Sequence, residues 1–439
     1  MSWYQPGTPL MGFANDPTAH QIQFVPPGAD FTQTGTQPGP SGASASGSSS
    51  PGPQFYPQGM GSSVRSREAA NFVASMAKQF DERPRLSFIK HLGIGRHGGT
   101  MLFHRLNAEG RPWRRIVIKY SLGNLSPDLQ SDADDDLRNE YSCLAGLKGA
   151  EHIGQLVYCP DTSLELPGVS DGDRSQPGPG ERRVPTMALE YIPNGTAYDM
   201  MERLIESRDG MPSRFLWRVF LCLVRQCIAM AFPPRKEWRD PLERERIIPG
   251  QEMYDMTQNS NHLKNVMFGD IQPEDLEHRL CPTVKLIDFG RGARVGTTGP
   301  TGDKYATSVN LLAAAEIIAQ MLFMGRPRDS NPPVLYKYTD RNNQQKEMYT
   351  IAAKEIYSCD TIDLELRDLM CRCYAHDSND SPTLQEALEI CEWQVRYKTA
   401  SNVQANVPAA IESDAEIRAK IQRYIFNAPY SEESSSGSN

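Results

Sequence analysis

The sequence has few of the features that mark secreted or membrane-bound proteins. Its nine cysteines are odd in number and scattered over 439 residues, so they do not form the disulfide framework of a secreted domain. The first residues contain neither the basic start nor the apolar run of a signal peptide. The longest apolar helix we expect, Leu311–Phe323, is short for a bilayer and is interrupted by Glu316 and Gln320. We therefore expect an intracellular protein, cytoplasmic or nuclear, with no membrane partner.

Excess positive charge is also absent, because 46 Lys and Arg residues face 54 Asp and Glu residues and the formal net charge is −8. A nucleic-acid-binding surface needs clustered basic residues. The short basic cluster Arg111–Arg115 is better interpreted as an exposed hairpin turn, and the acidic run Asp132–Asp136 as charge before the positive end of a helix. Cys371 and Cys373 lack further ligands at zinc-finger spacing. We expect no nucleic-acid partner.

Composition divides the chain into an ordered centre and two flanking segments. Gly, Pro, Ser, Thr and Gln dominate residues 35–57 without apolar periodicity, which predicts a disordered arm over residues 1–80. Residues 160–185 are rich in Gly, Pro, Asp and Ser, as in a long loop inserted between two strands. Residues 401–439 are interpreted as a C-terminal tail that contains one short helix over 413–426.

Periodicity predicts a β-rich region followed by helices. Leu86–Leu106 favours two strands around a glycine-rich turn, and Ile116–Lys119 favours a third strand that ends in a lysine. A helix follows in which Leu137, Tyr141, Leu144 and Leu147 form an apolar stripe beside Glu140. The later helices are expected at 197–208, 215–232, 311–323, 364–374 and 384–396.

Two short apolar segments place oxygen-bearing side chains on neighbouring strands. The segment Val284–Gly290 reads V-K-L-I-D-F-G and delivers Asp288, and His262–Phe268 reads H-L-K-N-V-M-F and delivers Asn265. Such oxygens are the hard ligands that Mg²⁺ prefers when it carries nucleotide phosphates. Asp288 alone would equally suit a strand that ends in a turn. The functional interpretation therefore depends on the other segments and on their order.

Those segments occur in one order along the chain. They are Leu92–Gly99 (L-G-I-G-R-H-G-G), Lys119, Glu140, Glu151–Leu156, Met187–Gly195 (M-A-L-E-Y-I-P-N-G), and the Asn265 and Asp288 segments. In this order the chain resembles the protein-kinase superfamily over roughly residues 85–395. It is most similar to a divergent group of kinase-like proteins of filamentous fungi, in which N-V-M-F-G-D and V-K-L-I-D-F-G-R recur together.

The resemblance implies an α+β, two-lobed protein-kinase-like fold. A small β-rich N-lobe with one helix would span residues 81–189, and a larger helical C-lobe would span residues 190–400. ATP and Mg²⁺ are the implied cofactors. The partners would be ATP and an unidentified protein substrate or partner.

The resemblance also implies roles for residues at the glycine-rich loop. Backbone N–H groups of Gly93, Gly95 and Gly98 would cover the phosphates, where side chains would block close approach. Lys119 would neutralise the α- and β-phosphates, and Glu140 would hold its ammonium group.

The remaining nucleotide contacts are implied further along the chain. The backbone of Glu190 and Ile192 would meet the adenine edge, and Leu189 would limit the pocket behind it. Asn265 and Asp288 would bind Mg²⁺.

The segment before Asn265 departs from the family pattern. Kinases carry an H-R-D or H-x-D triplet there, and its Asp accepts the proton of the substrate hydroxyl. Alignment on Asn265 places Gln258, Asn259 and Ser260 at these positions. A serine hydroxyl cannot act as a base near neutral pH without an activating partner. His262 is a candidate substitute base, or a loop histidine bonded to backbone.

The segment after Asp288 departs as well. Asn310, where we expect the buried helix to begin, follows Asp288 by 22 positions, and no A-P-E lies between them. Asn310 stands where kinases commonly have an Asp, so it cannot supply that charge. Both departures weaken the case for a peptide-docking platform.

The sequence is compatible with three functions. The first is a protein Ser/Thr kinase of divergent type, and the second is a pseudokinase that acts as a scaffold or allosteric module. The third is a small-molecule phosphotransferase with a kinase-like fold. Loss of the catalytic Asp beside retained Mg²⁺ ligands favours ATP binding with little phosphoryl transfer.

Overall fold

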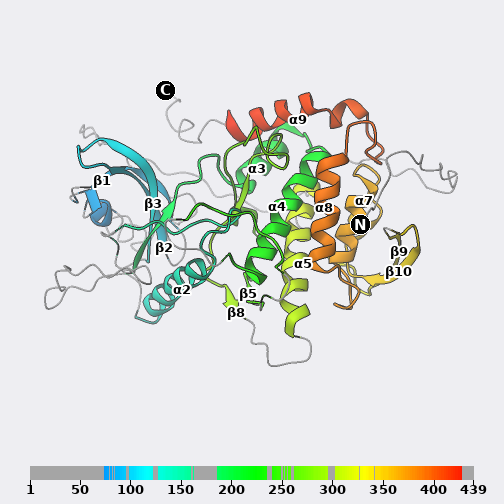
Figure 1. The fold of residues 1–439 in the computed structure, drawn as a ribbon, viewed down its shortest axis with the longest axis horizontal. Coiled ribbons are helices and arrows are strands. Elements are labelled where there is room, and N and C mark those ends of the chain that lie inside the picture. The colour runs from blue at the N-terminus through cyan, green and yellow to red at the C-terminus, as the bar shows by residue number, and fades with distance from the viewer. Residues whose placement is uncertain are drawn as a thin grey trace, which may run out of the picture. The chain divides into compact units, whose positions relative to one another are not determined.

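In the computed structural model, the chain is described over residues 74–78, 80–81, 83, 85–94, 98–121, 127–159, 162, 185–234, 240–248, 251, 253–254, 256–258, 262–294, 302–325, 327–340 and 342–427. The predicted N-terminal arm lies outside these residues up to position 73, and so does most of the predicted 160–185 loop. Within the described residues the fold is mixed α+β, with one four-stranded antiparallel sheet and several helices (Figure 1).

The four-stranded sheet has the order β1-β2-β3-β4. Its strands are β1 (Leu86–Ile94), β2 (Gly98–Leu106), β3 (Pro112–Ser121) and β4 (Thr186–Glu190). The two strands predicted over Leu86–Leu106 are thus confirmed. The basic cluster Arg111–Arg115 was wrongly expected to be a turn, because all of it but Arg111 belongs to β3.

The turn before β3 is made by an asparagine. The side-chain oxygen of Asn107 accepts the backbone N–H groups of Glu109 and Arg111 at 3.1 and 2.9 Å. Gly110 has a φ of 74°, a left-handed value that glycine adopts without steric cost. Turn chemistry, rather than the neighbouring charges, therefore sets where β3 begins.

Helix α2 (Pro127–Gly146) packs against β3 and carries Glu140. The acidic run Asp132–Asp136 lies inside this helix, so our placement of it before the helix start was wrong. Asp134 has a structural partner, because its Oδ1 accepts hydrogen bonds from Ser121 Oγ and Gln130 Nε2, both at 2.6 Å. Asp134 therefore joins the helix to Ser121 at the end of β3.

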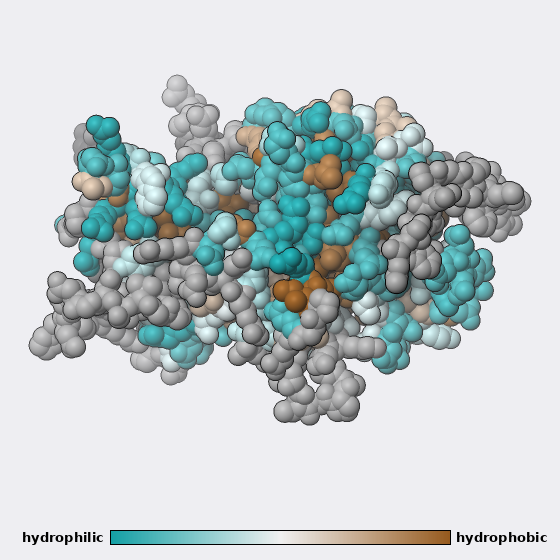
Figure 2. Space-filling model, viewed as in Figure 1, coloured by the Kyte–Doolittle hydropathy of each residue, from teal (hydrophilic) through white to brown (hydrophobic). Residues whose placement is uncertain are grey.

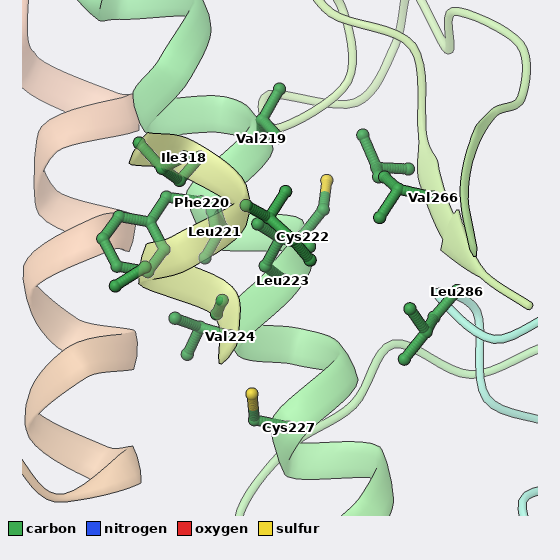
Figure 3. Packing of buried hydrophobic residues seen from close by; sticks show 14 of the residues in the cluster. Val219, Phe220, Leu221, Cys222, Leu223, Val224, Cys227, Val266, Leu286 and Ile318 are labelled. Carbon is green, nitrogen blue, oxygen red and sulfur yellow. The ribbon is translucent and has the colours of Figure 1, made fainter. Parts of the chain in front are cut away.

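The helices that follow β4 pack around α4 (Ser213–Ala231), which is buried at every position. Figure 3 shows Val219, Phe220 and Val224 of α4 among the apolar side chains of this core. The other main helices are α3 (Ala197–Ser207), α5 (Gly302–Phe323), α7 (Leu364–Cys373) and α8 (Leu384–Tyr397). Because apolar residues surround α4, it contacts α5, α8 and β7 at once.

Helix α5 begins at Gly302, earlier than the expected start at Asn310. Its segment Tyr305–Phe323 is long and apolar enough to cross a membrane, but 56% of the most apolar window is buried inside the protein. Because α5 begins at Gly302, Asn310 lies inside this helix. Its Nδ2 donates to the carbonyl of Met256 at 2.8 Å.

Short strand pairs complete the fold: β5 (Met256–Thr257) with β8 (Ala293–Arg294), β6 (Val266–Phe268) with β7 (Val284–Leu286), and β9 (Val334–Thr339) with β10 (Gln345–Thr350). The sequence interpretation did not include the β9–β10 hairpin. It is followed by the short helix α6 (Lys354–Tyr357). On the face shown in Figure 2, hydrophilic residues dominate and hydrophobic patches are small.

The described part of the predicted tail packs onto the helices. It contains η2 (Ala409–Glu412), α9 (Asp414–Ile421) and a π-helical turn, η3 (Gln422–Phe426). The carboxylate of Glu412 accepts the backbone N–H groups of Ser213 and Arg214 at 2.7 and 3.0 Å. These are free N–H groups at the start of α4, so Glu412 caps this helix across a long stretch of sequence.

Candidate functional site

Three charged residues from separate elements meet at one lysine. Lys119 lies on β3, Glu140 on α2, and Asp288 follows β7. The Lys119 Nζ atom is 2.5 Å from Glu140 Oε2 and 3.0 Å from Asp288 Oδ1. The Glu140 side chain is 2% exposed, whereas that of Asp288 is 48% exposed. One face of the cluster is therefore closed by protein and the other is open to solvent.

Both carboxylates act on the charge of the lysine. Burial alone would lower the pKa of Lys119, but the charges of Glu140 and Asp288 outweigh it and raise this pKa above its ordinary value. Burial raises the pKa of Glu140, and Lys119 opposes that shift. The cluster thus keeps a charged ammonium group between two acidic side chains.

The backbone at Asp288 is held in an uncommon conformation. Its φ is 64°, in the left-handed region that costs a residue with a side chain roughly 1–2 kcal/mol, less for Asp. Phe289 beside it is fully buried, and Gln258 Nε2 donates to the carbonyl of Ile287 at 2.8 Å. Packing and hydrogen bonding on both sides therefore impose this turn, as at sites where strain is maintained for function.

Asn139 anchors the same turn from α2. Its Nδ2 donates to the carbonyls of Gly290 and Gly292 at 2.9 and 2.8 Å. The neighbouring residue on the helix is Glu140, which binds Lys119. One turn of α2 therefore positions the lysine on the sheet and the Asp288 loop together. No motif in the sequence marks Asn139.

The predicted metal ligands flank two paired strands, since Asn265 directly precedes β6 and Asp288 follows the end of β7. Val266 of β6 pairs with Leu286 of β7, and the N–H of Ile287 donates to the carbonyl of Asn265 at 2.8 Å. Asn265 thus lies next to the residue that precedes Asp288. An amide oxygen and a half-exposed carboxylate are hard donors that fit Mg²⁺.

The predicted phosphate loop is described in part. At Gly93 an added Cβ would have nothing within 4 Å, so protein packing does not require glycine there. At Gly98 a Cβ would lie 2.6 Å from the carbonyl oxygen of Tyr120, so close approach of β2 to β3 requires this glycine. Gly95 lies outside the described residues.

The segment predicted to meet adenine is joined to β7, the strand that precedes Asp288. The Glu190 carboxylate binds Lys285 of β7 at 2.7 Å, and the Glu190 N–H donates to the carbonyl of Gln155 at 2.9 Å. Leu189 is half-buried against the larger core, and Ile192 is buried. These contacts fix the end of β4 relative to β7.

Only some of the residues predicted to take part in phosphoryl transfer belong to the described part of the chain. Ser260 and Asn259 lie outside the described residues. Gln258 is buried and binds backbone, so it supports the Asp288 turn. His262 is exposed at the start of η1 (Leu263–Asn265), and Lys264 lies 4.4 Å above the ring of Tyr198.

A cavity of about 250 Å³ lies between α4 and α5. Gln258 and Asn310 line it together with apolar side chains such as Leu223 and Ile317. Because none of the Lys119, Glu140 or Asp288 side chains lines this cavity, we do not assign the nucleotide to it.

Comparison with known families and proteins leaves the chemistry of the site as the main guide. No protein-family model matches this chain, and no curated protein has a significantly similar sequence.

Proposed function

We propose that this chain is a protein-kinase-like protein that binds ATP together with Mg²⁺. The observation that carries the proposal is the contact of Lys119 with both Glu140 and Asp288. In protein kinases, the ion pair between the strand lysine and the helix glutamate and the metal-binding Asp must both be in place. In this proposal β1–β4 and α2 form the small lobe, and the helices from α3 onward form the large lobe.

Each residue has a physical role in nucleotide binding. The ammonium group of Lys119 attracts phosphate oxygens, and Glu140 holds it in a fixed position. Asp288 and Asn265 would hold Mg²⁺, which when bound neutralises charge on the phosphates. Gly93 leaves open space beside the loop, and the β4 end near Glu190 and Ile192 would receive the adenine.

Phosphoryl transfer is the weaker part of the site. Ser260 replaces the Asp that would accept the hydroxyl proton. Gln258, aligned with the first position of the triplet, is engaged with backbone. We therefore infer ATP binding with little turnover, in which the bound nucleotide stabilises a scaffold or allosteric module for a protein partner.

A second candidate is an active phosphotransferase that uses His262 as the base. The exposed position of His262, just before Asn265, favours it. Because α5 begins at Gly302, the segment after Asp288 is shorter than expected and leaves less chain for a peptide platform. If transfer occurs, a small-molecule acceptor fits this segment better than a protein Ser or Thr.

The test combines thermal unfolding with a γ-phosphate transfer assay. ATP and Mg²⁺ at a hundredfold excess over the dissociation constant should stabilise the wild type by about 2.7 kcal/mol. Lys119→Met should lose this gain, whereas Lys346→Met, on the exposed β10 strand, should keep it. Ser260→Asp should gain transfer activity. Absence of stabilisation in the wild type would overturn the proposal, and strong wild-type transfer would favour His262.

A further inference from the structure

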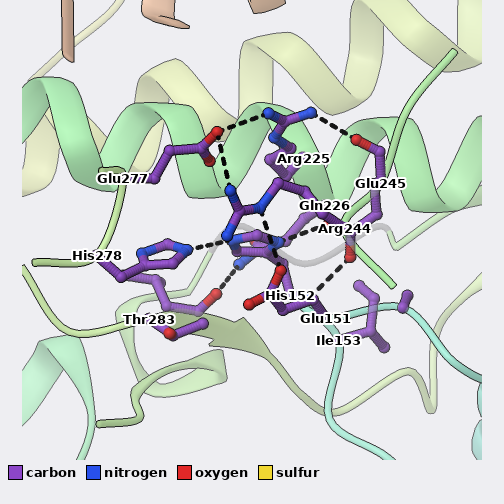
Figure 4. A network of polar contacts seen from close by, with 12 residues as sticks. Glu151, His152, Ile153, Arg225, Gln226, Arg244, Glu245, Glu277, His278 and Thr283 are labelled. Carbon is purple, nitrogen blue, oxygen red and sulfur yellow. Dashed lines mark hydrogen bonds and ion pairs between the residues drawn. The ribbon is translucent and has the colours of Figure 1, made fainter. Parts of the chain in front are cut away.

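A second cluster of chemically active side chains lies in the core, outside the Lys119 site. His152 follows α2, Cys222 lies on α4, and His278 lies between β6 and β7. All three are almost fully buried, and the ligand atoms of the three side chains lie within 4.8 Å of one another. Figure 4 shows the two histidines facing each other inside a network of Arg and Glu side chains.

The separation of the two imidazoles suits a shared metal ion. His152 Nε2 and His278 Nε2 are 3.2 Å apart. Two nitrogens bound to one tetrahedral zinc ion at 2.0–2.1 Å lie about 3.3 Å from each other. Without an ion, one uncharged imidazole would donate its Nε2–H to the Nε2 lone pair of the other.

The other nitrogen of His152 is held as in a metal site. His152 Nδ1 lies 2.6 Å from Glu245 Oε2, and both side chains are fully buried. The second oxygen of Glu245 accepts the backbone N–H of His152 at 2.8 Å. A carboxylate that binds Nδ1–H fixes the tautomer in which Nε2 carries the lone pair. The lone pair of His152 thus points toward His278.

The far ring nitrogen of His278 is unsatisfied. Among the described residues its buried Nδ1 has no hydrogen-bond partner, and an ion bound at Nε2 would not supply one. An oxygen of Asp275 lies 3.8 Å from His278 Nε2 and also binds Arg244. Asp275 belongs to a separate group of ligand atoms with Glu151 and His278, not to the group that contains His152 and Cys222.

The charge around the cluster is negative. Two guanidinium groups, of Arg225 and Arg244, face five carboxylates in this network; the carboxylates belong to Glu151, Glu245, Asp275, Glu277 and Glu392. Glu245 and Arg225 are buried and need compensation, whereas Glu392 and Arg244 are 40% and 34% exposed and are partly screened by solvent. A divalent cation between the histidines would reduce the excess.

We propose that His152, Cys222 and His278 bind a structural zinc ion. Imidazole nitrogens with a thiolate are the donor set that selects zinc over Mg²⁺ or Ca²⁺. The ion would join three segments that are far apart in the sequence: the residues after α2, the middle of α4 and the loop before β7. This proposal does not depend on nucleotide binding.

The test uses the full chain, purified without a metal-affinity tag. Metal analysis should find about one zinc per chain, and removal by a chelator should lower the melting temperature. Reconstitution with Co²⁺ should give the visible bands of a tetrahedral site and a sulfur-to-cobalt charge-transfer band. Cys222→Ala should lose the charge-transfer band, and His278→Asn should lower the Co²⁺ affinity at least tenfold.

Cys227→Ala is the matched control, because Cys227 is a buried thiol on the same helix and outside the cluster. It should keep both the metal content and the charge-transfer band. Absence of stoichiometric zinc together with absence of the band in wild type would overturn the proposal and leave a His–His hydrogen bond. An unchanged band in Cys222→Ala would overturn it equally, because the cobalt would then be bound elsewhere.

Discussion

The Lys119 cluster and the His152 cluster both pair carboxylates with nitrogen-bearing side chains but differ in their access to solvent. In the first, Asp288 is 48% exposed, so one carboxylate can meet a ligand. In the second, His152 and Glu245 are fully buried. A charged side chain that remains exposed beside a fixed ammonium group is suited to binding, whereas a closed network of imidazole, guanidinium and carboxylate groups is suited to holding chain segments together.

The two clusters also differ in how they join the fold. The Lys119 cluster joins the sheet, α2 and the Asp288 turn by side chains on a few elements. The His152 cluster binds backbone as well, since Arg225 Nη1 donates to the Glu245 carbonyl at 2.5 Å. We therefore expect substitutions in the buried cluster to change stability most, and substitutions in the open cluster to change ligand binding most.

The largest effect is expected for Glu245→Ala. It leaves the His152 Nδ1–H and N–H groups buried without their acceptor, which should cost about 1–3 kcal/mol of unfolding free energy for each donor. Urea unfolding followed by circular dichroism measures this loss. Glu243→Ala is the control, because Glu243 pairs with Arg246, which is 69% exposed. Equal losses in both variants would show that the buried contacts of Glu245 contribute no more to stability than an exposed ion pair does.

A smaller effect is expected for Asn139→Ala. Two carbonyls of the Asp288 turn lose their donor, which should cost about 1–3 kcal/mol and speed amide exchange over 289–292. ATP should also bind less tightly, although the Lys119–Glu140 pair remains. Hydrogen exchange with mass spectrometry checks this. The control is Arg138→Ala, at the exposed neighbouring position, which should leave amide exchange unchanged. Unchanged exchange in Asn139→Ala would show that the Asp288 turn is stable without the Asn139 side chain.

Asp209 gives a pH-dependent test outside both clusters. Burial raises its pKa, but hydrogen bonds from Lys420 and Tyr424 outweigh this and lower the pKa below its ordinary value. Its contribution is therefore complete above pH 4 or so and is lost as the pH falls through the folded-state pKa. Asp209→Asn should cost about 1 kcal/mol at pH 7 and less in acid. A constant difference from pH 7 to pH 2 would exclude this linkage.

The smallest effect is expected for Arg246→Ala. The pair of Arg246 with Glu243 is exposed, and such pairs contribute about 0–1 kcal/mol. The melting temperature should stay within error of the wild type at physiological salt. A large drop in melting temperature would show that the exposed fraction of an ion pair does not indicate its contribution to stability.

Local patterns account well for the helices and strands with clear periodicity. The apolar residues of α4 and α8 and the strands around the glycine turn were predictable because each segment carries its own pattern. The start of α5 was not, since its polar first turns hide the apolar periodicity that begins near Leu311. The β9–β10 hairpin buries Tyr336 and Met348 on one face, but the polar residues between them, such as Lys337 and Glu347, hide the alternation in the sequence.

The candidate site was only partly predictable from the sequence. The resemblance to kinases suggested Lys119, Glu140 and Asp288, and the structure brings their side chains together. Asn139 follows no motif, because its role depends on the fold of the Asp288 turn. His152 and His278 are separated by more than a hundred residues, so no spacing in the sequence indicates that they meet.

The most direct test of ATP and Mg²⁺ binding is isothermal titration calorimetry of wild type and Asp288→Asn, each with ATP in the presence and absence of Mg²⁺. We predict that Mg²⁺ raises the ATP affinity of the wild type at least tenfold and leaves that of Asp288→Asn nearly unchanged. ATP binding that is absent, or that responds to Mg²⁺ equally in both proteins, would contradict the assignment of Asp288 as the metal ligand at a nucleotide site.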